Sequence, residues 1–187
     1  MQDILDRTGS DDGLDQVGTA GKALIGAAAG AVGTWALDRA DWRMWNNEDA
    51  EARQQTTDVR PGGEPPAQVL AGTIEKAFHL DPSPEQHELA GQVIHYSIGI
   101  APAVAYALFR DRLPGKGPAR GALYGLGLFL AQDEALNTVT GLGADPRRYP
   151  WQAHARGLVA HLVYGVVTEL ALDLAGKALT RDRQASA

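Results

Sequence analysis

The stretch LAGQVIHYSIGIAPAVAYALF, residues 89–109, decides the fold. It holds no Asp, Glu, Lys or Arg over 21 positions, about the length of helix that crosses the hydrocarbon core of a bilayer. A helix of a soluble bundle shows a polar face along its whole length. Here Gln92, His95, Tyr96 and Ser97 cluster within two turns, and the other residues are mostly Ala, Gly, Val, Ile and Leu. The stretch therefore favours a membrane-spanning helix over one helix of a soluble four-helix bundle.

Three other segments share this apolar character. The first begins near residue 17 and ends at the charges of Asp38 and Asp41. Another, from residue 121 to about 142, is uncharged except for Asp133 and Glu134, and a last one begins near residue 152. We predict an all-α fold, a four-transmembrane-helix bundle with helices at about residues 17–40, 85–110, 119–142 and 152–179.

The remaining sequence is polar. Residues 1–16 are acidic and poor in large apolar groups, which predicts a mobile tail, and they lack the basic start of a secretory signal. Residues 180–187 form a second polar tail. The polar insert, residues 41–84, contains apolar residues at helical spacing from Val69 to Phe78, which predicts an amphipathic helix. Ser83 and Pro84 predict the N-cap and first position of the next helix.

The composition excludes several classes of function. The chain has 187 residues and no cysteine, so disulfide scaffolds, zinc-thiolate sites, iron–sulfur clusters and thiol nucleophiles are excluded. A net charge of -6 disfavours a nucleic-acid partner, because phosphate binding needs a basic face. The mean hydropathy of -0.21 is typical of a soluble protein. However, this value averages the polar tail and the polar insert together with the apolar helices. The predicted partner is the lipid bilayer.

Small residues recur along the predicted helices at intervals of four or eight. In lipid, helices associate through close backbone contact over such stripes, so these residues are expected at helix contacts. They are Gly26, Gly30 and Thr34 in the first helix, Gly91, Gly99 and Ala103 in the second, and Gly121 and Gly125 in the third.

Basic residues predict the orientation of the bundle, since they favour the cytoplasmic side of a membrane. Because the predicted number of crossings is even, both termini then lie in the cytoplasm and the polar insert lies outside. Arg147, Arg148 and Arg156 count against this orientation. The residues that support it are Arg110, Arg112, Lys116 and Arg120 between the second and third helices, and Lys177, Arg181 and Arg183 after the fourth.

Two blocks of the sequence match a known pattern. Asp133 and Glu134 are followed by Asn137, and PWQAHARG at residues 150–157 leads into His161, Tyr164, Gly165 and Glu169. Over roughly residues 26–175 the chain resembles the YagU-like family of small bacterial inner-membrane proteins of unknown function. The resemblance implies a multi-pass protein of the bacterial inner membrane, and it supplies no catalytic residues.

Ionisable and polar side chains within the apolar segments are the candidate functional residues, because a charge at membrane depth is costly unless it is paired or hydrated. The predicted pathway or buried polar network consists of His95, Asp133, Glu134, Asn137, His154, Arg156, His161, Tyr164 and Glu169. One hypothesis is structural: these groups hydrogen-bond across helices and fix the register of the bundle. A second is a relay for protons or a cation.

A metal-dependent enzyme is the third hypothesis, and the sequence argues against it. The di-iron bundles carry Glu-x-x-His pairs, and no Glu in this chain is followed by His three residues later. The nucleophile elbow, the H-E-x-x-H motif and the phosphate-binding loop are also missing. We therefore predict no catalytic residues, no metal and no cofactor. An alternative to the pathway is an accessory subunit that docks on a larger membrane complex or forms a homo-oligomer.

Overall fold

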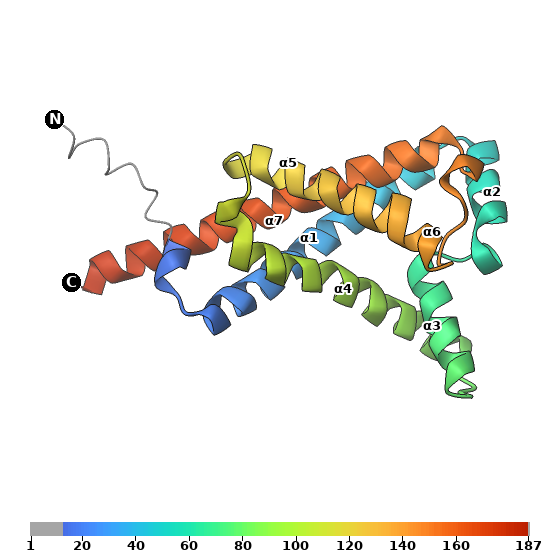
Figure 1. Ribbon diagram of the computed structural model, residues 1–187, viewed down its shortest axis with the longest axis horizontal. Helices are drawn as coiled ribbons and strands as arrows, with labels where there is room; N and C mark the ends of the chain where they lie inside the picture. Colours follow the sequence, from blue (N-terminus) through green and yellow to red (C-terminus); the bar gives the residue numbers. More distant parts are fainter. Residues whose placement is uncertain (1–12, 187) are drawn as a thin grey trace.

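Four helical runs dominate the computed structural model, which describes residues 13–186 and contains no β-strand within them. They lie along the long axis of the molecule (Figure 1). The long helices are α1 (Thr19–Asn47), α4 (Pro84–Phe109), α5 (Gly117–Leu128) and α7 (Trp151–Ser186). The shorter elements are η2 (Gly13–Gln16), α2 (Ala50–Val59), η3 (Pro61–Gly63), α3 (Pro66–Ala77), η4 (Arg110–Arg112), the π-helix η5 (Phe129–Leu136), α6 (Asn137–Val139) and η6 (Pro146–Arg148).

The bundle has two different ends. Helices α2, α3 and α6 gather at one of them, which we call the insert end, and the C-terminal part of α7 lies at the other (Figure 1). This second end also holds η4, the link between α4 and α5, and we call it the turn end. Each long helix runs from one end to the other, so residues distant in the sequence meet at both.

Glycines set the closest helix contacts. On α5, a Cβ added at Gly121 would lie 2.6 Å from the carbonyl oxygen of Gly165, and one added at Gly125 would collide with the carbonyl of His161 on α7. On α1, a Cβ at Gly30 would lie 2.6 Å from the Cβ of Ala103 on α4. These small-residue stripes are therefore packing surfaces within the chain, as the sequence predicts.

Three helices are long and apolar enough to cross a membrane: Thr19–Asn47, Pro84–Arg112 and Trp151–Asp182. Their apolar side chains largely face outward. In the most apolar window of the second, only 17% of the residues are buried, and Leu24, Leu89 and Leu174 are each more than 60% exposed. Such extensive apolar surface is compatible with a membrane protein, because lipid and not water can cover it.

The predicted third membrane helix differs from expectation, so a four-span bundle is not established. Regular α-helix ends at Leu128 and continues as the π-helix η5 and one turn of α6, ending at Val139 rather than near residue 142. The π-helical part carries Asp133 and Glu134. In a π-helix each bond spans five residues, so it changes the direction of the side chains that follow.

Two other predicted boundaries need correction. Helix α1 continues to Asn47 and so includes the start of the predicted insert, while α7 continues to Ser186, so most of the predicted polar tail at residues 180–187 is helical. Within the predicted mobile tail, residues 1–12 lie outside the described range. Its last residues form the turn η2, in which Leu14 is buried and packs in one apolar cluster with Leu172 of α7.

Two predictions for the insert are confirmed. The amphipathic helix is α3, Pro66–Ala77, which packs on α4 with Gln68 against Gly91. Ser83 is the N-cap of α4 and Pro84 its first residue. The Gln86 side chain accepts a hydrogen bond from the backbone N–H of Ser83, which completes a capping box.

Candidate functional site

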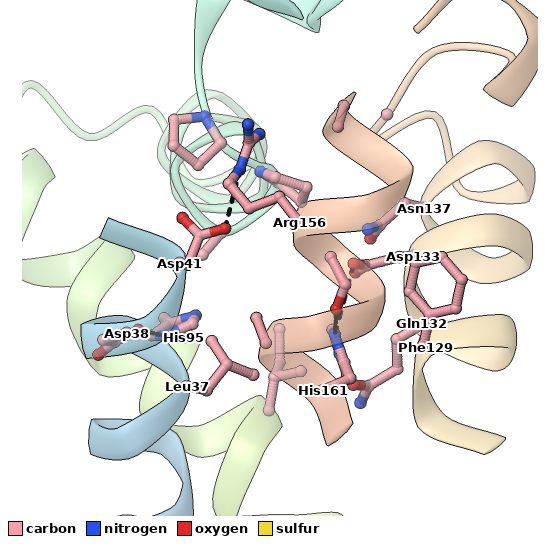
Figure 2. A pocket seen from close by; sticks show the side chains of 18 of the residues that line it. Leu37, Asp38, Asp41, His95, Phe129, Gln132, Asp133, Asn137, Arg156 and His161 are labelled. Atoms are coloured by element: carbon pink, nitrogen blue, oxygen red, sulfur yellow. Dashed lines mark hydrogen bonds and ion pairs between the residues drawn. The ribbon is translucent and has the colours of Figure 1, made fainter. Parts of the chain in front are cut away.

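A cavity of about 740 Å³ opens at the insert end. Figure 2 shows it between α1, α4, η5 and α7, with Asp38, His95, Asp133 and His161 among the side chains around it. Its inner limit is marked by Gly99 and Tyr164, which lie near the middle of α4 and toward the middle of α7. The cavity therefore reaches from one end of the bundle toward its centre.

Carboxylates meet imidazoles at three places on the cavity wall. The shortest contact, 2.6 Å, joins Glu134 and His154, and the longest, 3.6 Å, joins Asp133 and His161. The pairs are His95 Nε2 with Asp38 Oδ1 at 2.8 Å, His154 Nδ1 with Glu134 Oε1, and His161 Nδ1 with Asp133 Oδ2. The structure thus brings together most of the predicted network, and it adds Asp38.

Asp133 is the least satisfied of these carboxylates. His161 Nδ1 lies 2.9 Å from the carbonyl oxygen of Gly157, so it donates its hydrogen there and not to Asp133. No hydrogen bond joins the Asp133 carboxylate to another residue of the described range. A Cβ on Gly157 would lie 2.9 Å from Asp133 Oδ2, so this glycine makes room for the carboxylate. Asn137, one turn further along, also lines the cavity.

Arg156 links α7 to the end of α1 at the mouth of the cavity. Its Nε donates to Asp41 Oδ1 at 2.9 Å, its Nη1 donates to Glu48 Oε2, and its guanidinium lies 4.7 Å from the ring centroid of Trp45. Asp41, one of the charges at which the first apolar segment ends in the sequence, is thus an ion-pair partner of α7 (Figure 2). These contacts bind the end of α1 to α7 and place Trp45 on the wall.

Arg60 is the second guanidinium of the cavity, at the start of the turn η3. Within the described range it makes no ion pair, and its nearest aromatic contact is with Trp45, at 5.8 Å from the ring centroid. Burial lowers the pKa of Arg60, and the charge of Arg156 lowers it further. The negative charges of Asp41 and Asp133 oppose that shift. The two carboxylates therefore act electrostatically on Arg60 from a distance, and neither forms an ion pair with it.

Three tyrosines close the inner end of the cavity. The Tyr164 hydroxyl donates to the carbonyl oxygen of Gly99 at 2.6 Å, and it lies 3.2 Å from the Tyr124 hydroxyl. Because the Tyr164 hydrogen is used for Gly99, Tyr124 is the donor in that pair. The Tyr124 ring stacks on Tyr106. Tyr164 thus belongs to a column of aromatic rings that separates the cavity from the turn end.

Glu169 lies beyond this column, apart from the cavity. Its carboxylate is fully buried, and it accepts hydrogen bonds from Tyr106 at 2.8 Å, from Arg110 at 3.1 Å and from Arg120 at 2.6 Å. Arg110 also donates to Asp173 at 2.8 Å. We call Tyr106, Arg110, Arg120, Glu169 and Asp173 the turn-end cluster. The single network predicted from the sequence is therefore divided into two.

Sequence reasoning missed the arginines and tyrosines of this cluster. Arg110 and Arg120 were expected in an exposed basic turn, yet they are 1% and 9% exposed. Only Arg112 and Lys116 remain exposed in that turn, so the basic charge that supports the predicted orientation is smaller than the sequence indicates. Glu169 and Asp173 are four residues apart on one helix face, a spacing that could have indicated a cationic partner on a neighbouring helix.

Comparison with known proteins gives no further guide. No protein-family model matches the chain, and neither a curated protein nor a solved structure is detectably similar to it. The resemblance to the YagU-like family therefore stays a prediction. Any functional conclusion has to come from the cavity, the tyrosine column and the turn-end cluster themselves.

Proposed function

We propose that the protein is a multi-pass protein of the bacterial inner membrane that forms a pathway for protons or a cation. One observation carries the proposal: a cavity lined by four carboxylates and three imidazoles enters the bundle from one end and stops at Tyr164, and a second polar cluster begins on the other side of the tyrosine column. Ionisable groups at membrane depth commonly mark ion pathways. A purely structural network does not need a cavity of this size.

The charges of the cavity favour a cation. Four carboxylates line it against two guanidinium groups, those of Arg60 and Arg156. With neutral imidazoles the wall is therefore net negative, and an acidic cleft with apolar walls raises the local concentration of cations. The carboxylates are those of Asp38, Asp41, Asp133 and Glu134.

Hydroxyl groups offer a route for protons past the cavity. Tyr164 and Tyr124 are hydrogen-bonded to each other, and Tyr106 is hydrogen-bonded to Glu169. The route is interrupted only where Tyr124 and Tyr106 meet through their ring faces. The cavity would supply protons through its imidazoles, since histidine changes charge near neutral pH.

The proposal includes a fourth crossing and an orientation. Residues 117–139 are continuously helical through α5, η5 and α6, and their length is sufficient for a membrane span. Both termini would then be cytoplasmic and the cavity would open to the periplasm. Asp133 and Glu134 would lie in this crossing, at the π-helical segment, and π-helical turns are frequent at functional sites.

Proton flux into vesicles tests the pathway. The purified protein is reconstituted into liposomes that contain a pH-sensitive dye, and a pH gradient is imposed. We expect flux above that of protein-free vesicles, and a fall of about tenfold in Asp133→Asn because the variant loses a titratable group on the cavity wall. Asp81→Asn, in the exposed loop before α4, is the matched control. Flux equal to protein-free vesicles under all gradients and cations tested would contradict the pathway.

An accessory subunit is the second candidate, and a specific surface favours it. Phe78 and Leu80, at the end of α3, are 72% and 58% exposed, while the glycine stripes that could have served a partner are used within the chain. Purification in mild detergent tests this candidate. A stoichiometric partner that is lost in a Phe78→Ser, Leu80→Ser variant would support it, and a protein that purifies alone would argue against it.

A further inference from the structure

The size and chemistry of the cavity indicate an organic ligand. A volume of about 740 Å³ falls within the 300–1,000 Å³ of small-molecule sites, and it is far larger than a proton or one bare ion requires. No three metal-ligating side chains come together in residues 13–186. The aromatic rings of Trp45, Phe129 and Tyr149 line much of the wall, which is typical of sites for small organic molecules.

Two charges in this cavity lack a strong partner. Asp133 has only His161 at 3.6 Å. Arg60 has no ion pair in the described part of the chain, and it contacts only the ring of Trp45. The two groups line the same cavity and have opposite charge, yet they form no ion pair with each other. A partly buried charge without a counter-charge is costly, so each of them is a site for a charge brought by a ligand.

The other ionised groups of the wall are already engaged. Asp38 is held by His95 at 2.8 Å and Glu134 by His154 at 2.6 Å. Arg156 is shared between Asp41 and Glu48. A ligand therefore meets one free anion and one free cation in the cavity.

We propose that the cavity binds a zwitterionic amino compound of the amino-acid type, with its ammonium group on Asp133 and its carboxylate on Arg60. The inference rests on the pathway proposed above, because it names an organic molecule, with one cationic group and no net charge, that enters the same cavity. An ammonium group donates charge-assisted hydrogen bonds to a carboxylate, and a planar guanidinium donates two parallel hydrogen bonds to a carboxylate. Such a ligand satisfies both charges and leaves the net charge of the cavity unchanged.

Trp45 lies beside Arg60 and helps to hold its guanidinium in position for a ligand. The guanidinium groups of Arg60 and Arg156 lie 5.8 and 4.7 Å from the centroid of its ring. Stacking of a guanidinium on an indole restricts its motion without using its N–H donors. The donors of Arg60 therefore remain available for a ligand carboxylate.

Matched ligands separate the two ends of the proposed substrate. Binding to the purified full-length protein in nanodiscs is measured by isothermal calorimetry for alanine, leucine and phenylalanine. Each is compared with its decarboxylated amine and its deaminated acid, for example ethylamine and propionate for alanine. We expect at least one amino acid to bind at least about tenfold more tightly than both of its halves, because each half leaves one charge of the site unpaired.

Variants assign each end to its residue. Arg60→Gln should weaken amino-acid binding about tenfold and leave amine binding unchanged, whereas Asp133→Asn should weaken both. Arg60→Lys should restore part of the lost affinity. The controls are Arg43→Gln, on the exposed surface of α1, and Asp81→Asn, and thermal melts of every variant identify those that fail to fold.

Three outcomes would overturn the inference. They are absence of binding for all three amino acids, amine binding as tight as that of the parent amino acid, and equal binding by folded Arg60→Gln. The vesicle assay distinguishes a failure of the ligand proposal from a failure of the proposed pathway. Proton flux without amino-acid binding overturns the ligand and keeps the pathway, whereas binding without any flux or uptake keeps the ligand and overturns the pathway.

Discussion

The phenol ring of Tyr106 lies flat against that of Tyr124, with ring centroids 3.9 Å apart and an interplanar angle of 8°. Tyr106 comes from α4 and Tyr124 from α5, so the stack joins these two helices. On one side Tyr124 bonds to Tyr164, which lines the cavity, and on the other Tyr106 bonds to Glu169 of the turn-end cluster. The stack therefore lies between the two polar regions, and in the proposed pathway it is the seal between them.

Substitution of Tyr124 tests this seal. Tyr124→Phe keeps the ring but removes the hydroxyl that reaches Tyr164, so proton flux should fall while the protein remains folded. Tyr124→Ala removes the ring and should open a leak for small cations, together with a loss of about 3–5 kcal/mol of stability. Vesicle flux and thermal melts measure both effects. The unaltered protein is the reference, and equal flux in Tyr124→Phe and the unaltered protein would exclude the hydroxyl relay.

Glu169 should be essential for stability. Its replacement by Gln leaves Arg110 and Arg120 buried without their shared carboxylate, and removal of one partner of a buried ion pair costs about 3–5 kcal/mol. Arg110 keeps its ion pair with Asp173 at 2.8 Å, whereas Arg120 keeps only a longer pair, 3.3 Å, with the exposed Asp111, so the larger loss falls on Arg120. The free energy of unfolding in detergent is the measurement, with the exposed Glu88→Gln as the control. The double variant Arg120→Gln, Glu169→Gln should be more stable than Glu169→Gln alone, and a purely additive double variant would contradict the coupling.

Two glycines of α5 provide a matched pair. Gly125→Ala should destabilise the bundle, because the added methyl group collides with the carbonyl of His161 on α7. Gly127→Ala meets nothing within 4 Å, so it should be neutral or stabilise the helix by up to about 1 kcal/mol through its higher helix propensity. Thermal melts of the two variants under identical conditions make the comparison. Equal effects would mean that the α5–α7 contact is not as close as described.

The sequence predicts the helical class, the glycine contacts and four membrane helices, of which three are long and apolar enough to cross a membrane, because each prediction depends on local composition and spacing. The uncharged run at residues 89–109 and the cap at Ser83 are examples of such local signals. The pairing of Arg110 and Arg120 with Glu169 could not be predicted, because it joins three helices across up to 59 positions of sequence. Sequence position near a turn indicates an exposed arginine, and only the packing of the helices shows it to be buried.

The π-helix η5 was also beyond prediction. Hydrophobic spacing does not distinguish a π-helical segment from a regular helix over eight residues. The close approach of Asp133 to Gly157 depends on the packing of η5 against α7. Likewise, Asp41 has the sequence context of a headgroup-level charge, and its partner Arg156 lies 115 positions away. The sequence therefore identifies the candidate residues by their chemical type, but it does not identify the residues with which they pair.

Labelling of single cysteines tests whether the bundle lies in a bilayer and whether its cavity opens at one end only. The chain has no cysteine, so single-cysteine variants report without background. Gln132→Cys lies on the cavity wall, and Leu130→Cys, two residues earlier on the same π-helix, is on the outer surface, where Leu130 is 53% exposed. Both variants are treated in membrane vesicles of either orientation with a membrane-impermeant maleimide. We expect labelling of Gln132→Cys from one face only and of Leu130→Cys from neither. Rapid labelling of Leu130→Cys would show water on the outer surface and would exclude a bilayer around the bundle.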